Sequence, residues 1–163
     1  MASRYPLAGL LFLRNLREEN AARAVRAAEA AARLAAAARE AQEKKLAEYR
    51  LWRREETERR YRSIMGQTLS RTELDDFKTG LALLDERELA EVEELRQAES
   101  ALAEAEAKTA AAREDWRAAD RARRKLLTHQ DEWRTAEARE AGRQEDLELE
   151  EFKPGAPGAQ LDP

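Results

Sequence analysis

The stretch "GQTLSRTE", residues 66–73, is the only break in a chain that otherwise has the pattern of continuous helix. Gly66 can adopt the left-handed backbone conformation that often follows the last turn of a helix. Ser70 and Glu73 form the S-x-x-E pattern of a capping box, in which two side chains satisfy free backbone amides at a helix start. The stretch therefore predicts one helix that ends and a second that begins.

No proline lies between residues 7 and 152, so each arm can form one continuous helix. We expect an N-terminal tail at 1–6, a first arm at 7–65, a hairpin turn at 66–72 and a second arm at 73–152. The final segment "KPGAPGAQLDP", 153–163, is rich in proline and glycine and predicts a disordered tail.

Composition also favours long helices. Charged residues make up 39% of the 163 residues, and there are only 6 glycines and 4 prolines. Alanine, arginine, glutamate and leucine dominate, and all four are strong helix formers. Disorder is the alternative for so charged a chain, but alanine and leucine recur with helical spacing. The composition is typical of a coiled coil.

The second arm has a heptad pattern, in which positions a and d face a partner helix. Its a positions are Leu74, Leu81, Leu95, Leu102 and Trp116. Its d positions are Phe77, Leu84, Ala98, Ala105, Ala112, Ala119, Leu126, Trp133 and Leu147. The pattern is broken at Glu88, Glu91 and Arg123 and in the stretch after Trp133. The first arm fits a weaker register, with Ala21, Ala28, Ala35 and Tyr49 at a and Leu10, Ala24, Ala31, Ala38 and Trp52 at d.

Folding the chain at the turn pairs residues whose numbers add up to about 137, and this places the alanine-rich stretch 21–41 against the alanine-rich stretch 96–116. Residues 1–65 carry a net charge of +6 and residues 66–163 a net charge of −10, so the arms attract each other. We therefore expect an all-α fold, a single-chain antiparallel two-helix coiled-coil hairpin. It should be monomeric and elongated, with a first arm of roughly 90 Å.

The residue types required for most catalytic sites are missing. There is no cysteine, and His129 is the single histidine, so a Ser-His-Asp triad or a two-histidine metal site is excluded. Two exposed helices also enclose no pocket in which a carboxyl pKa could be shifted. We expect no enzyme activity, no cofactor and no metal.

Nucleic-acid and membrane binding are also disfavoured. The run "RLWRREETERRYR" mixes glutamates with its arginines, whereas a phosphate-binding surface usually keeps one sign of charge. The apolar stretch "YPLAGLLFL" at 5–13 is too short to span a bilayer. We expect a cytoplasmic protein that is peripheral to a membrane at most.

Four large side chains stand in the charged run 48–61, "EYRLWRREETERRY": Tyr49, Leu51, Trp52 and Tyr61. A two-helix seam is too narrow to bury all of them, so at least two should face solvent. Two interpretations remain open. The exposed side chains form a docking patch for a partner, or they belong to the fold and cover the seam and the arginine stems.

Several segments, taken in order, resemble one protein family. They are "YPLAGLLFLRNLREENAARAV" at 5–25, "YRLWRREETERRY" at 49–61, "LSRTELDDFKTGLALLDERE" at 69–88 and "WRTAEAREAGRQEDLELEEF" at 133–152. They are similar to the YscO/SctO stalk proteins of type III secretion systems, relatives of the flagellar export protein FliJ. The resemblance covers about residues 4 to 153, and the high alanine content of 21–41 departs from the family.

The resemblance implies a non-catalytic central stalk that couples the hexameric secretion ATPase to the export gate and binds export chaperones at the inner-membrane apparatus. It implies an ATPase-facing end with Leu10, Leu13, Arg14, Arg17, Arg23, Arg26, Leu126 and Leu127. It implies an export-gate or chaperone contact near the hairpin tip with Tyr49, Leu51, Trp52, Tyr61 and Phe77. A generic coiled-coil spacer and the flagellar export homologue, as opposed to a virulence-type protein, remain the alternatives.

Overall fold

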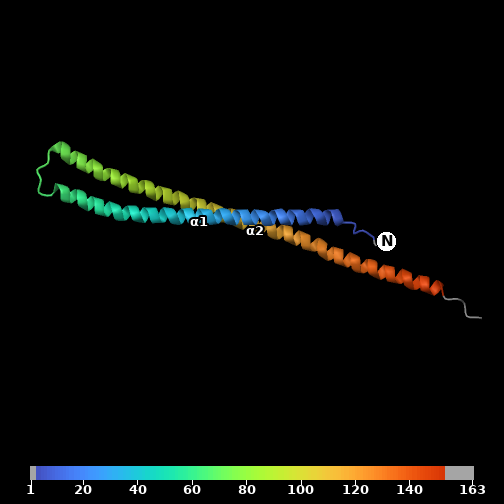
Figure 1. The fold of residues 1–163 in the computed structure, drawn as a ribbon. Helices are drawn as coiled ribbons and strands as arrows, with labels where there is room; N and C mark the ends of the chain where they lie inside the picture. Colours follow the sequence, from blue (N-terminus) through green and yellow to red (C-terminus); the bar gives the residue numbers. More distant parts are fainter. Residues whose placement is uncertain (1–2, 153–163) are drawn as a thin grey trace, which may run out of the picture. The chain divides into compact units, whose positions relative to one another are not determined.

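The computed structural model describes residues 3–152, in which all regular structure is helical. Helix α1 spans Ala8–Ile64 and helix α2 spans Arg71–Glu151. The helices run antiparallel and are joined by a turn (Figure 1), which confirms the predicted two-helix hairpin. The tail predicted at 153–163 lies outside the described residues.

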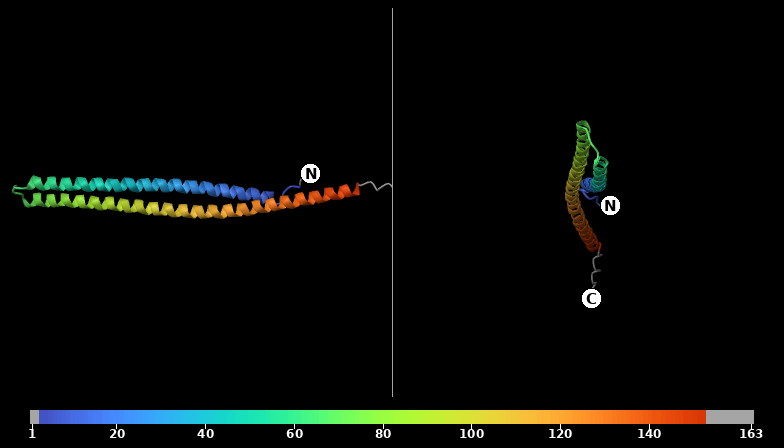
Figure 2. Two further views of the ribbon diagram at one scale, coloured as in Figure 1. Left: turned by 90° about the horizontal axis from the view of Figure 1, so that it is seen from below. Right: turned by 90° about the vertical axis from the view of Figure 1, so that its left-hand side faces the viewer.

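The contacts divide the chain into two compact units, and each contains part of both helices. The first unit holds the chain up to Asn20 together with the chain from Trp116 onward. The second unit is Ala21–Asp115, which includes the turn. Within each unit the segment of α1 lies beside the segment of α2 (Figure 2).

The turn has the chemistry that its sequence predicts. Gly66 adopts a φ of 74°, which a residue with a Cβ atom enters only at a cost. The amide of Gln67 donates to the carbonyl oxygen of Ile64 at 3.2 Å and closes the end of α1. The amide of Glu73 donates to the Ser70 hydroxyl at 3.2 Å, and the Glu73 carboxylate accepts from the Ser70 amide at 2.8 Å. The predicted capping box is confirmed.

The predicted register between the helices is also confirmed. In the second unit Tyr61 contacts Phe77 and Lys45 pairs with Glu91, and in both pairs the residue numbers add up to about 137. In the first unit Tyr5 contacts Trp133, which follows the same rule. Each unit therefore pairs its helices as a hairpin folded at the turn requires.

The seam of α2 follows the predicted heptad. Leu84 is 7% exposed, and most of the other predicted a and d residues are half-buried. One predicted position was wrong, because Leu74 is 39% exposed. Leu74 is the seam position of α2 nearest the turn. Leu147 is 61% exposed, and it lies in the stretch after Trp133 where the heptad pattern is broken. Leu147 lies beyond Glu137, which accepts a hydrogen bond from Ser3 near the N-terminus of the chain.

The predicted d positions of α1 were wrong by one residue. The predicted side chains are exposed: Leu10, Ala24, Ala31, Ala38 and Trp52. The seam is occupied instead by their neighbours Leu11, Val25, Ala32, Arg39 and Arg53. Alanines stand at adjacent positions through 21–41, so a one-residue shift there changes little buried area. Leu11 and Leu46 are 9% and 4% exposed. Burial of these large side chains helps to determine which side of α1 faces α2.

The acidic residues that break the predicted heptad remain in the seam because each has partners. Glu91 is 6% exposed and accepts a hydrogen bond from the Gln42 amide at 2.8 Å. The Lys45 ammonium lies 3.5 Å from the same carboxylate. Glu88, half-buried, pairs with arginines of α1. A buried carboxylate is tolerated where its charge and oxygens are matched, so these pairs favour one register over its neighbours.

In the first unit an aromatic cluster joins the N-terminal segment to α2. Tyr5 is 6% exposed, although it lies in the stretch expected to be a tail. Its hydroxyl oxygen lies 2.6 Å from Nδ1 of His129, and its ring centroid lies 5.4 Å from that of Trp133. The indole of Trp116 donates to the Glu18 carboxylate at 2.9 Å. Polar contacts thus accompany the aromatic packing of this unit.

Candidate functional site

The structure separates the aromatic residues of the second unit into two groups. In the first, the rings of Tyr49 and Trp52 lie 5.7 Å apart between centroids. The guanidinium of Arg87 lies 5.6 Å from the Tyr49 ring, within reach of a cation–π interaction. Tyr49 lies in the seam and donates a hydrogen bond to the carbonyl oxygen of Leu84 at 2.8 Å, whereas Trp52 is 44% exposed. Tyr49 is therefore fixed in the seam and contacts the exposed indole of Trp52.

The second group lies closer to the turn. The rings of Tyr61 and Phe77 meet edge to face with centroids 5.2 Å apart. Tyr61 is 48% exposed and Phe77 is half-buried. Leu51 is 58% exposed. The prediction that at least two of the four large side chains at 48–61 face solvent is confirmed, since Leu51, Trp52 and Tyr61 do so.

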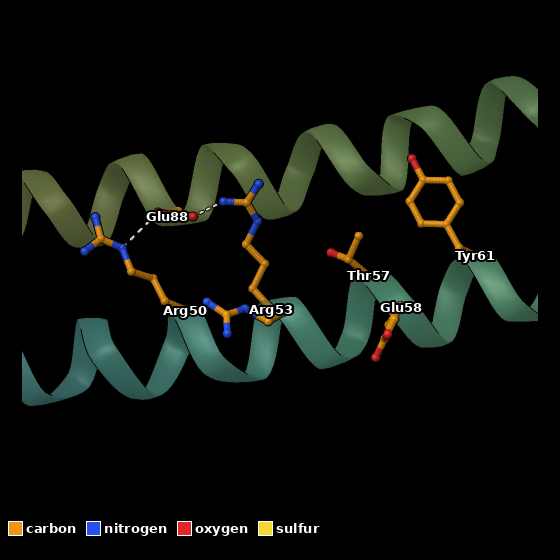
Figure 3. A pocket seen from close by; sticks show the side chains of 7 residues that line it. Arg50, Arg53, Thr57, Glu58, Tyr61 and Glu88 are labelled. Atoms are coloured by element: carbon orange, nitrogen blue, oxygen red, sulfur yellow. Dashed lines mark hydrogen bonds and ion pairs between the residues drawn. The ribbon is translucent and has the colours of Figure 1, made fainter.

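A groove runs along one flank of α1 in this unit (Figure 3), and its volume is about 580 Å³. Its lining consists of Arg50, Arg53, Arg54, Thr57, Glu58, Tyr61 and Glu88. All but Glu88 come from α1, where spacings of three and four residues place side chains on one face. Three cations and one aromatic ring thus share one open surface with two carboxylates.

Two of these arginines are held by α2. Arg50 donates from Nε to the Glu88 carboxylate at 2.9 Å. Arg53 donates to both Glu88 and Asp85. Arg54 forms no hydrogen bond or ion pair with any residue from 3 to 152. The groove therefore contains one guanidinium whose donors remain available.

In the first unit an apolar face of α1 is exposed beside the seam. The predicted residues Leu10 and Leu13 are 39% and 47% exposed. Phe12 and Leu16, which the predicted site residues did not include, are 68% and 41% exposed. The unbroken run "LLFL" at 10–13 was the available signal, because no helix can bury four consecutive side chains against one partner.

The other residues predicted for this surface differ in their surroundings. Leu126 and Leu127 are half-buried on α2, so they support the seam more than they present a surface. Arg14 is half-buried, and its Nε atom lacks a hydrogen-bond partner in the described structure. Arg17 is exposed in the same unit. Arg23 and Arg26 are also exposed, but they belong to the Ala21–Asp115 unit.

Between residues 3 and 152 there is no group of three or more acidic, histidine or cysteine side chains that could hold a metal ion. Among the same residues, no helix has the length and apolar character needed to cross a membrane. A hydrogen bond from Arg96 lowers the pKa of the Glu93 carboxyl, and the same contact raises the pKa of Arg96. This exposed pair does not line the groove described above.

Comparison with known proteins agrees with this architecture. Residues 7–154 match the family of the type III secretion protein YscO. The crystal structure of YscO from Vibrio parahaemolyticus is similar over 90% of this chain and 92% of that chain, with a TM-score of 0.82 and 28% sequence identity. A YscO homologue from Chlamydia trachomatis shares the fold, with a TM-score of 0.75, 18% identity and 93% of each chain covered. A search of curated proteins gave no match. Because the family match covers nearly the whole two-helix hairpin, this chain belongs to the YscO family of type III secretion proteins.

Proposed function

We propose that this protein is the central stalk of a virulence-type secretion system, coupling the hexameric secretion ATPase to the export gate. Its membership of the YscO family, together with exposed apolar side chains on both units, carries the proposal. The stalk acts as a monomer in the cytoplasm, at the inner-membrane apparatus, and binds export chaperones. It is not catalytic: an asymmetric two-helix hairpin inside a ring favours turnover at one ATPase interface over the others.

The first unit supplies the ATPase contact in this proposal. Leu10 and Leu13, extended by Phe12 and Leu16, form an exposed apolar face of the kind that marks protein interfaces. Arg17 lies on the same segment of α1, and arginine is enriched in interfaces. Arg14 adds a second cation to this unit, while Leu126 and Leu127 are half-buried and keep α2 packed against α1. The partner surface is therefore apolar with acidic groups around it.

The ATPase contact is tested by measuring ATP hydrolysis of the hexamer with and without the stalk. Leu13→Asp should reduce the stimulation at least about fivefold, since a buried interface leucine contributes about 1 kcal/mol or more. Arg17→Glu should also weaken the stimulation. Helicity should be unchanged in both variants, because the side chains of Leu13 and Arg17 are exposed.

Leu34→Asp is the matched control, because Leu34 is 74% exposed on α1 in the alanine-rich segment. It should leave the stimulation unchanged. Equal stimulation by the parent and the Leu13→Asp variant would contradict the placement of the ATPase contact.

The second unit supplies the export-gate or chaperone contact. Trp52, Leu51 and Tyr61 are the side chains available to a partner, and tryptophan and tyrosine often dominate binding energy. Tyr49 and Phe77 hold Trp52 and Tyr61 in place through ring contacts. The proposed contact therefore consists of three exposed side chains, two of which pack against a ring that belongs to the fold.

Secretion and thermal melting, measured on the same variants, test this contact. Trp52→Ala, and separately Leu51→Ala with Tyr61→Ala, should reduce secretion with a nearly unchanged melting temperature. Leu89→Ala is the control, since Leu89 is 69% exposed on α2. A generic spacer needs only its seam, so normal secretion by all of these variants would favour that alternative.

A further inference from the structure

We propose that the groove formed by Arg50, Arg53, Arg54, Thr57 and Tyr61 binds an acidic peptide segment of a partner protein. The inference rests on the proposed function, because it gives the chemistry of a partner at the second unit. It also assigns two parts of that unit's surface to different kinds of contact. The acidic segment occupies the arginine groove, and the Tyr49–Trp52 pair is left to apolar contacts.

The charge of the lining favours an anionic ligand. The groove contains Arg50, Arg53 and Arg54, against the carboxylates of Glu58 and Glu88. A second groove of the same unit has a similar volume, about 550 Å³. Its charged residues are Arg33 and Arg113 against Glu29 and Glu106, so its lining is balanced. The arginine groove is thus distinguished by its excess of positive charge, not by its size.

The hydrogen bonds within the groove show where a ligand would bind. Glu88 accepts from both Arg50 and Arg53, so it fixes these two side chains against α2 (Figure 3). Glu58 lies 3.7 Å from the guanidinium of Arg62, which satisfies part of its charge. Arg54 makes no hydrogen bond or ion pair with the other described residues. A ligand carboxylate can therefore pair with Arg54 without displacing an existing partner.

The rest of the lining suits a peptide better than a small inorganic anion. Tyr61 offers an exposed ring, and its edge is fixed by the contact with Phe77. Thr57 places a methyl group and a hydroxyl between this ring and the arginines. An acidic segment that also carries an apolar side chain can place its carboxylate on Arg54 and the apolar group on Tyr61. Guanidinium–carboxylate pairs of this kind are stronger than neutral hydrogen bonds.

Fluorescence anisotropy with the full chain tests the proposal. The probe is a short labelled peptide of glutamate, leucine and glycine, and the comparison peptide has glutamine at each glutamate. We expect saturable binding of the glutamate peptide that weakens with added salt. Arg54→Ala should weaken this binding about tenfold, the loss expected for one charge-assisted pair. Tyr61→Ala should weaken it as well.

Arg33→Ala is the matched control, because Arg33 is an exposed arginine of the balanced groove. It should change the dissociation constant less than about twofold. Equal loss in Arg33→Ala and Arg54→Ala would overturn the proposal, as would equal binding of the glutamine peptide. Tighter binding of a single-stranded oligonucleotide that Arg54→Ala removes would identify a nucleic-acid surface instead. A dimer in sedimentation that Arg54→Ala abolishes would make a second copy the occupant.

The same variant separates this inference from the proposed function. If Arg54→Ala loses the acidic peptide while secretion stays normal in Trp52→Ala and in Leu51→Ala with Tyr61→Ala, the acidic-ligand inference stands and the proposed gate contact fails. If secretion falls in Trp52→Ala while the peptide binds Arg54→Ala as well as the parent, the proposed function stands and the acidic-ligand inference fails.

Discussion

The hydroxyl of Tyr49 donates a hydrogen bond to the carbonyl oxygen of Leu84 at 2.8 Å, and this bond joins α1 to α2 across the seam of the second unit. Leu84 is itself 7% exposed, so the bond lies in a buried part of that seam. The Tyr49 ring also contacts the ring of Trp52. One tyrosine thus connects the packing of the two helices to the exposed indole proposed as a docking group.

Removing the Tyr49 hydroxyl should destabilise the protein slightly. We expect Tyr49→Phe to lower the free energy of unfolding by about 1 kcal/mol, the typical net value of one hydrogen bond. Urea unfolding followed by circular dichroism measures the change. Tyr61→Phe is the matched control, because the Tyr61 hydroxyl bonds to no described residue, and we expect a loss below about 0.5 kcal/mol. Equal losses would show that the bond to Leu84 contributes nothing specific.

Truncation of seam leucines should be costly in proportion to their burial. Leu46 is 4% exposed, so Leu46→Ala should cost about 2 kcal/mol or more. Leu84→Ala should cost a similar amount. Leu34 lies on the same helix as Leu46 but is 74% exposed, and Leu34→Ala should cost about 0.5 kcal/mol or less. Similar melting temperatures for Leu46→Ala and Leu34→Ala would contradict the observed phase of the α1 seam.

Alanine should have opposite effects at two glycines. Gly66 has a φ of 74°, so Gly66→Ala should destabilise the hairpin by about 1 kcal/mol through backbone strain. Gly142 lies inside α2, and a Cβ atom there would meet no other atom within 4 Å. Gly142→Ala should therefore strengthen the helix locally by about 0.5–1 kcal/mol. Hydrogen exchange of amides near each site measures both effects. Slower amide exchange near residue 66 in the Gly66→Ala variant would contradict the prediction for the turn.

The polar pair in the seam should determine the specificity of pairing more than its strength. Gln42 and Glu91 are joined at 2.8 Å in a buried layer. Replacing both by leucine removes the cost of burying a charge, so stability should be unchanged or higher. The apolar layer no longer discriminates between registers, so sedimentation should detect oligomers besides the monomer.

The single substitution Glu91→Ala provides the contrast. It removes the 2.8 Å hydrogen bond from the Gln42 amide and leaves that amide only its 3.3 Å bond to the backbone carbonyl oxygen of residue 91. Stability should therefore fall by about 1 kcal/mol, the typical net value of one hydrogen bond. A double-leucine variant that stays monomeric would mean that the polar pair is not needed to select the register.

The sequence by itself was sufficient to determine the helices, the turn and the register. Gly66 and the Ser70–Glu73 capping box act through local backbone chemistry, which needs no distant contact. The heptad of α2 is marked by large residues such as Leu84, so its buried face could be predicted. Membership of the YscO family rests on the sequence match to that family over residues 7–154.

Only the tertiary structure decided which side of α1 faces the seam. Through the alanine-rich segment, neighbouring residues bury almost equal areas, so the periodicity of α1 alone is compatible with two phases. The choice depends on distant partners: Leu46 packs into the seam, and Arg53 rotates inward to reach Glu88 and Asp85 on α2. Trp52 is turned outward as a result, and Arg54 is left in the groove without a partner among the described residues. Contacts between residues far apart in the chain, which no local pattern encodes, therefore determine which side chains this protein presents to solvent.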